Sequence, residues 1–146
     1  MDYERTYDKL YRYCFFKLRD CHLAEDVTQE SFLRWVEHGQ RGGEAYLYTV
    51  ARNLCIDHWR KRPTDTLPDD LTQPGPEEAV IQRTDLQRAL EALPEEEREL
   101  ILLRWVDELP VGTIAKLMGI SRFAVYRRTE QARKHLKEQL GRENFG

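Results

Sequence analysis

Six side chains near the C-terminal end recur at helical spacing and are able to hydrogen-bond or stack. On a helix, Phe123, Tyr126, Arg127, Glu130 and Lys134 share an outward arc, with Arg122 at its margin. Arginine can bind guanine through two hydrogen bonds, glutamate can accept one from cytosine, and an aromatic edge can touch a thymine methyl. The spacing predicts a helix that reads base pairs, and a solvated arginine-rich surface is the alternative.

A second set combines aromatic and basic character on a helix predicted over residues 46–62. The face directed away from its apolar stripe carries Thr49, Arg52, Asn53, Ile56, Trp59 and Arg60. A tryptophan among arginines is what a surface needs to stack on unpaired bases while neutralising phosphates. The alternative is that Ile56 and Trp59 pack against another helix or against a second domain.

A third face is mostly acidic. At about 100° per residue on a helix, it contains Asp26, Gln29, Glu30, Leu33 and Glu37. Taken alone, this pattern is typical of a solvated surface.

The elements that carry these residues follow from apolar periodicity and caps. Pro94 begins a helix with Glu95–Glu97 at its positive end. A short helix containing Ile114 then leads to a turn at Gly119, and Ser121 can cap a second helix. Residues expected to face inward on that helix are Val125, Thr129, Ala132 and Leu136. Together these features predict a helix-turn-helix.

Three helices are predicted before residue 62. The first buries an aromatic stripe of Tyr3, Tyr7, Leu10, Tyr11, Cys14 and Leu18. Asp20 caps the second, which runs to about His38. The third buries Leu47, Ala51, Leu54 and His58.

The charge distribution divides the chain of 146 residues into segments. Residues 1–62 have a net charge of +1, residues 63–97 of −8 and residues 98–146 of +4. Four of the six prolines, namely Pro63, Pro68, Pro74 and Pro76, lie within residues 63–78 of the acidic segment. Proline and solvated carboxylates disfavour a regular helix, so residues 63–84 are predicted to be a linker. The fold class is therefore all-α, with two small helical domains, the second a helix-turn-helix.

Composition also bounds the location and chemistry of the chain. No apolar run is long enough to span a bilayer, and the N-terminus has no signal-peptide core, so we expect a cytoplasmic protein. Three cysteines, Cys14, Cys21 and Cys55, leave an odd one and disfavour a disulfide scaffold. Nothing matches a catalytic constellation or a Gly-rich phosphate loop, so we predict neither an enzyme nor a cofactor.

The sequence resembles the extracytoplasmic-function (ECF) group of sigma-70 family sigma factors. The segment AEDVTQESFLRW is similar to the part of sigma region 2 that grips the clamp helices of the polymerase β′ subunit. YLYTVARNLCIDHWRKR is similar to the part that melts the minus-ten element, and LPVGTIAKLMGISRFAVYRR to the minus-thirty-five recognition unit. The resemblance places region 2 at residues 1–62, the linker at 63–84, region 4 at 85–140 and a tail at 141–146.

The resemblance implies roles and partners for the residues singled out above. Core RNA polymerase would be bound through its β′ clamp helices by Asp26, Gln29, Glu30 and Leu33, and also through its β flap. Minus-ten DNA would be bound by Arg52, Asn53, Trp59, Arg60, Lys61 and Arg62. Minus-thirty-five DNA would be bound by Arg122, Phe123, Tyr126, Arg127, Glu130 and Lys134. The chain would recruit the polymerase and open the promoter, and an anti-sigma factor would cover its exposed apolar residues.

Two other functional interpretations fit part of the sequence. A homodimeric helix-turn-helix regulator explains the second domain but leaves the acidic face and the aromatic-basic helix without a purpose. A zinc site is the other, because Cys55 and His58 are one helical turn apart, with Cys14, Cys21 and His22 in the same domain. The chain has no CxxC pair, and a buried free cysteine is the commoner case.

Overall fold

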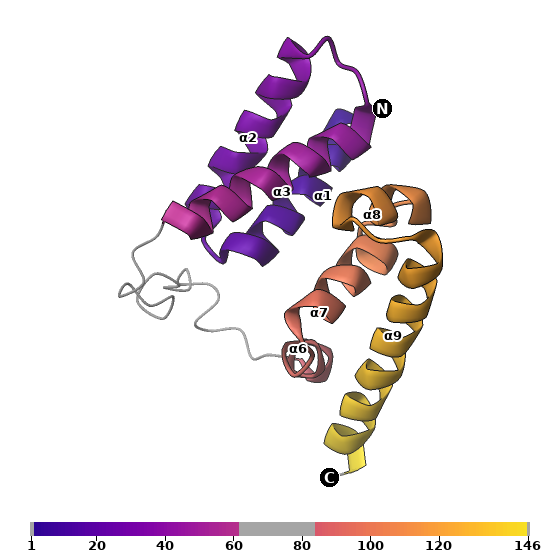
Figure 1. The fold of residues 1–146 in the computed structure, drawn as a ribbon. Coiled ribbons are helices and arrows are strands. Elements are labelled where there is room, and N and C mark those ends of the chain that lie inside the picture. Colours follow the sequence, from indigo (N-terminus) through magenta and orange to yellow (C-terminus); the bar gives the residue numbers. More distant parts are fainter. Residues whose placement is uncertain (1, 62–83, 146) are drawn as a thin grey trace. The chain divides into compact units, whose positions relative to one another are not determined.

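A computed structural model describes residues 2–61 and 84–145, with no account of the side chains beyond 141. The described residues form two compact units (Figure 1). Within these ranges the chain is helical and has no strand, which confirms the all-α prediction. None of the described helices has the length and apolar character needed to cross a membrane. Arg62 and nearly all of the predicted linker lie outside the described residues.

Unit 1 is a bundle of α1 (Tyr3–Leu18), α2 (Cys21–Glu37) and α3 (Gly43–Lys61), each packed against the other two. Asp2 caps α1, and Asp20 caps α2 by accepting hydrogen bonds from the backbone N–H groups of His22 at 2.9 Å and Leu23 at 3.1 Å. The cap predicted at Asp20 is therefore confirmed, and α2 ends one residue before His38.

The buried face of α1 differs from the predicted stripe. Its buried residues are Thr6, Leu10, Tyr13, Cys14 and Leu18. Tyr13 packs edge-on against Tyr48 of α3, with ring centroids 5.4 Å apart, and replaces Tyr11 as the inward aromatic. Tyr3 was predicted to be inward but is 55% exposed, because it is the first residue of α1; its ring is tilted by 54° against that of Trp35, with the centroids 5.9 Å apart.

The buried face of α3 also differs from the prediction. Its buried residues are Leu47, Tyr48, Ala51 and Cys55. The stripe thus follows the series i, i+4, i+8 from Leu47, which leaves Leu54 half-buried and His58 exposed. The inward assignment of His58 was wrong because the buried face turns toward Cys55, where α1 and α2 both pack on α3.

Unit 2 begins with two short helices and a π-helical turn. These are α6 (Asp85–Glu91), α7 (Glu95–Ile101) and η1 (Leu102–Val106). Thr84 and Gln87 form a capping box at the start of α6, with hydrogen bonds of 3.1 and 2.9 Å. Pro94 directly precedes α7, as predicted, and the three glutamates occupy its first turn.

The helix-turn-helix consists of α8 (Val111–Met118) and α9 (Arg122–Phe145). Gly119 joins them with φ of 68°, a left-handed conformation that favours glycine. The Ser121 hydroxyl accepts a hydrogen bond from the backbone N–H of Ala124 at 3.0 Å. In Figure 1, α9 is the long helix against which α6, α7 and α8 pack. It remains helical to Phe145, through residues predicted to form a tail.

Candidate nucleic-acid interface

One face of α9 is exposed along the first three turns of the helix. Val125, Thr129 and Ala132 are buried, as predicted, and hold the helix on the core. Opposite them, Phe123 is 73% exposed and Tyr126 is 55% exposed. The remaining members of the predicted set, Arg122, Arg127, Glu130 and Lys134, are exposed as well. The structure therefore brings all six residues together on one accessible surface, which we call the α9 face.

Cation–π contacts order the aromatic residues of the α9 face. The guanidinium carbon of Arg127 lies 5.8 Å from the centroid of the Phe123 ring. Arg104 of η1 lies 5.5 Å from the centroid of the Tyr126 ring. Such contacts restrict the rotamers of large exposed side chains and lower the entropy lost when they meet a ligand. Arg104 was not predicted, since its approach to Tyr126 depends on packing between η1 and α9.

Glu130 is held by a neighbour on its own helix. Arg133 donates to both of its carboxylate oxygens, at 2.8 and 3.2 Å. This hydrogen bonding is the main cause of a lowered pKa at Glu130 and a raised pKa at Arg133. Glu130 is therefore an ionised acceptor whose orientation is set by Arg133.

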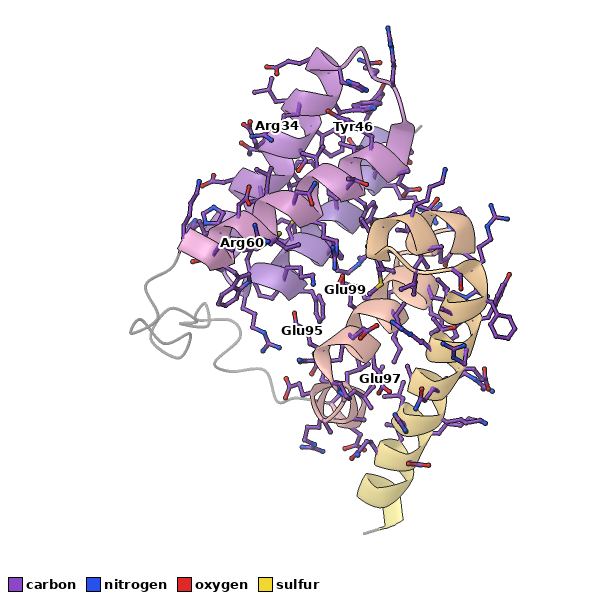
Figure 2. The ribbon with its side chains drawn as sticks, in the orientation of Figure 1. Arg34, Tyr46, Arg60, Glu95, Glu97 and Glu99 are labelled. Atoms are coloured by element: carbon purple, nitrogen blue, oxygen red, sulfur yellow. The ribbon has the colours of Figure 1, made fainter. Side chains whose placement is uncertain are left out.

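Acidic residues of α7 fix the position of α9. Arg128 forms an ion pair with Glu96 at 2.5 Å, and Nδ1 of His135 lies 2.7 Å from the Glu97 carboxylate. Glu97 is labelled on α7 in Figure 2. The carboxylates predicted to interact with the helix dipole of α7 thus also bind α9, a role that helical periodicity alone does not reveal.

The side chain of Arg122, at the start of α9, lies close to the backbone of α8. A Cβ added at Gly112 of α8 would lie 3.0 Å from a terminal nitrogen of Arg122. The absence of a side chain at Gly112 therefore lets the Arg122 guanidinium lie directly over α8. This position sets the start of the α9 face.

The aromatic-basic face of α3 is centred on Trp59. Its ring is 39% exposed, and its Nε1 donates a hydrogen bond to the backbone carbonyl of Lys17 at 2.9 Å. Asn53, Arg60 and Lys61 are exposed, whereas Arg52 and Ile56 are half-buried. Figure 2 labels Arg60 on the last turn of α3. The indole thus contacts another helix, as the packing alternative expects, and keeps part of its surface exposed, as base stacking requires.

The acidic face of α2 has an apolar centre. Asp26 and Gln29 are exposed, Glu30 is half-buried, and Leu33 is 52% exposed among them. Arg34 donates to Glu30 at 3.0 Å and holds that carboxylate against the helix. Val36, one helical turn further along α2, is exposed as well, so an apolar pair lies beside the carboxylates.

The short connection between α2 and α3 is ordered by ring stacking. The rings of His38 and Tyr46 are parallel, with centroids 4.5 Å apart. Gly39, Gln40, Gly42 and Gly43 between them have positive φ angles. The connection therefore reverses the chain within a few residues, a geometry that the three glycines accommodate without strain.

The residues considered as zinc ligands do not all converge. Cys14 and Cys55 are buried and in contact with each other, whereas Cys21, His22 and His58 are exposed. Within residues 2–61 and 84–145, no three histidine, cysteine or acidic side chains form a group able to hold a metal ion.

Comparison with known proteins decides the family. Residues 2–63 match Sigma-70 region 2, and residues 83–136 match Sigma-70 region 4. The ECF RNA polymerase sigma factor SigW of Bacillus subtilis is 31% identical, over 91% of this chain and 83% of SigW. This chain belongs to the ECF group of the sigma-70 family. SigM of the same organism is 30% identical, over 96% of this chain and 93% of SigM.

Solved structures agree on the fold of this ECF sigma factor. The sigma factor RpoE of Bartonella quintana, solved in complex with the anti-sigma factor NepR, matches with a TM-score of 0.68 at 21% identity. That match covers 93% of this chain and 92% of the other. The sigma factor assignment is confirmed, and the alternative of a homodimeric regulator is not favoured. Unit 1 is sigma region 2, and unit 2 is sigma region 4.

Proposed function

We propose that this sigma factor docks on core RNA polymerase through α2, reads the minus-thirty-five element through α9 and captures minus-ten bases through α3. The observation that carries the proposal is the exposure of three aromatic rings, Phe123, Tyr126 and Trp59, each with basic residues on the same face. Such rings are costly to leave in water and suit contact with bases. The polymerase core supplies the chemistry of RNA synthesis, so the chain itself acts without catalysis, in the cytoplasm.

The α9 face fits the major groove of a duplex. Arg127 is exposed and supplies a fork of donors for guanine, while Phe123 beneath it can contact a thymine methyl. Glu130, ionised and oriented by Arg133, can accept a hydrogen bond from cytosine. Arg122 and Lys134 lie at either end of the set and suit phosphate contacts.

The α3 face suits single-stranded DNA. Exposing a base costs a few kcal/mol, and stacking on an aromatic ring returns about 1–3 kcal/mol per base. Trp59 must give up its hydrogen bond to Lys17, which costs about 1 kcal/mol or less because water replaces the acceptor. We assign base capture to Trp59 with Arg52 and Asn53. Arg60, Lys61 and Arg62 are assigned to phosphates.

The α2 face suits the clamp helices of the β′ subunit. Leu33 provides apolar contact at its centre, while Asp26, Gln29 and Glu30 provide acceptors for basic or amide groups around it. Central apolar contacts ringed by polar groups are typical of protein interfaces.

Unit 2 has further exposed apolar residues that fit protein partners. Leu86 of α6 and Trp105 and Val106 of η1 are exposed. We assign them to the β flap of the polymerase and, in the inactive state, to an anti-sigma factor. The solved RpoE structure is a complex with the anti-sigma factor NepR, and another similar structure is CnrH in complex with the cytosolic domain of CnrY. Purification from the native cell with no inhibitory protein bound, under any growth condition, would contradict the anti-sigma assignment.

Run-off transcription with purified core polymerase tests the proposal. Trp59→Ala should impair promoter opening while leaving closed-complex formation intact. Arg127→Ala should instead weaken binding to the upstream element. Two variants that transcribe like the wild type would remove both site assignments.

A further inference from the structure

Two thiols meet in the core of unit 1. Cys14 on α1 and Cys55 on α3 are both fully buried, and their side chains are in hydrogen-bonding contact. The Thr28 hydroxyl of α2 also hydrogen-bonds to Cys14 and donates to the Ala24 carbonyl at 2.6 Å. All three helices of unit 1 therefore converge on this pair of sulfurs. A single buried cysteine is ordinarily a small core residue, but an oxidant can join two in contact into a disulfide.

The surroundings favour the reactive form of Cys14. The hydrogen bond from Cys55 lowers the pKa of the Cys14 thiol, burial raises it, and the Thr28 hydroxyl lowers it, with a net decrease. The thiolate is the nucleophilic form of cysteine, and a neighbouring thiol can resolve its oxidised product. By contrast, Cys21 is exposed at the start of α2.

We propose that Cys14 and Cys55 form a reversible disulfide when the chain meets a peroxide. The Cys14 thiolate attacks one peroxide oxygen, so an S–O bond forms, the O–O bond breaks, and the departing hydroxide takes up a proton to become water. The Cys55 thiol then attacks the Cys14 sulfur, forming the S–S bond and releasing a second water that takes up the Cys55 proton. The two thiols lose two electrons to the peroxide, which reaches them during transient opening of the helices.

The position of the pair suggests what the bond controls. Lys17 lies three residues after Cys14 on α1, and Trp59 lies four residues after Cys55 on α3. The disulfide would therefore lock α1 to α3 about one helical turn from the hydrogen bond between Trp59 and Lys17. Resting on the function proposed above, we infer that oxidation keeps Trp59 against α1 and reduces base capture.

Peptide mapping tests the disulfide independently of transcription. The full chain is treated with hydrogen peroxide, alkylated under denaturing conditions and digested. We expect a linked peptide pair joining Cys14 to Cys55, lighter by two hydrogen atoms than the separate peptides and absent after dithiothreitol. Cys21→Ser, the matched control, should form the same pair, and oxidation should raise its Tm by about 10 °C. Cys14 and Cys55 both remaining alkylatable, or pairing with Cys21 instead, would overturn the proposal.

Transcription with core polymerase tests the consequence. Oxidised Cys21→Ser should open promoters less than its reduced form, with recovery after dithiothreitol, while Cys14→Ala and Cys55→Ala should not respond to peroxide. A confirmed disulfide with unchanged promoter opening would overturn the regulatory inference. Failure of the reduced wild type to open promoters would contradict the proposed function itself and leave the peptide result standing.

Discussion

The indole Nε1 of Trp59 donates to the backbone carbonyl of Lys17 at 2.9 Å, which joins the last turns of α3 and α1. Trp59 is 39% exposed, so this contact with the protein coexists with aromatic surface open to a ligand. The hydrogen bond holds the side chain against α1 until DNA arrives. Releasing it costs about 1 kcal/mol or less, which a stacking energy of about 1–3 kcal/mol per base can offset.

Substitution at Trp59 separates stacking from hydrogen bonding. Trp59→Phe keeps an aromatic face and loses the N–H donor, so it should retain most open-complex formation. Trp59→Ala loses the stacking energy of about 1–3 kcal/mol and should reduce the open-complex population by about 10-fold or more. Fluorescence of 2-aminopurine placed in the minus-ten element measures both. An equal loss in the two variants would show that the contact with Lys17, rather than stacking, supports opening.

Alanine substitutions at Leu33 and Phe123 should separate polymerase docking from recognition of the upstream element. Leu33→Ala removes an exposed apolar side chain from α2, and Phe123→Ala removes one from α9. We expect Leu33→Ala to weaken binding to core polymerase, measured without DNA by fluorescence anisotropy, and Phe123→Ala to leave that affinity unchanged. Binding of the holoenzyme to the upstream element should be weakened by Phe123→Ala and unchanged in Leu33→Ala. Loss of core binding in both variants would mean that the α2 assignment is not specific.

The pair of Glu130 and Arg133 predicts a pH response with a defined direction. Its lowered pKa means that Glu130 adds stability above the pKa it has in the unfolded chain, and this stability is lost as the pH falls through the lowered value. Because the pair is fully exposed, the effect on unfolding is small. NMR titration should show the Glu130 pKa rising toward its ordinary value in Arg133→Ala. Lys137→Ala, which removes a weaker attraction, should raise it less, and an unchanged pKa in Arg133→Ala would refute the pairing.

The contacts of Glu96 with Arg128 and of Glu97 with His135 should stabilise unit 2 modestly. Glu97→Gln and Glu96→Gln each remove one carboxylate that contacts α9, at an expected cost of about 0.5 kcal/mol because the contacts are partly exposed. Glu138→Gln makes the same charge change on the exposed surface of α9 and serves as the control. Urea unfolding followed by circular dichroism measures the differences. If Glu138→Gln loses as much stability as the other two variants, the change in net charge explains the loss, and the contacts between α7 and α9 do not.

Local features of the fold could be predicted from the sequence because a few neighbouring residues determine them. The cap at Asp20, the left-handed turn at Gly119 and the cap at Ser121 depend on side chains reaching backbone atoms two or three residues away. The α9 face follows from the inward series that begins at Val125. Such short-range chemistry also explains why the sequence predicts the helix-turn-helix.

Features that depend on tertiary packing could not be predicted in this way. His58 was expected inside because a single helical period cannot show how two neighbouring helices rotate the buried face toward Cys55. The contacts of Trp59 with Lys17 and of Arg128 with Glu96 join residues 42 and 32 positions apart. Only the packing of the helices brings such pairs together.

Permanganate reactivity of unpaired thymines tests the central claim most directly. Genomic fragments are first transcribed with core polymerase and this chain to select a promoter. The permanganate reactivity of its thymines is then mapped with each protein alone and with both together. The proposed function predicts reactive minus-ten thymines only when both proteins are present, with reactivity strongly reduced in Trp59→Ala. A chain that binds duplex DNA tightly by itself at a palindromic site, and leaves the thymines unreactive when core polymerase is added, would contradict it.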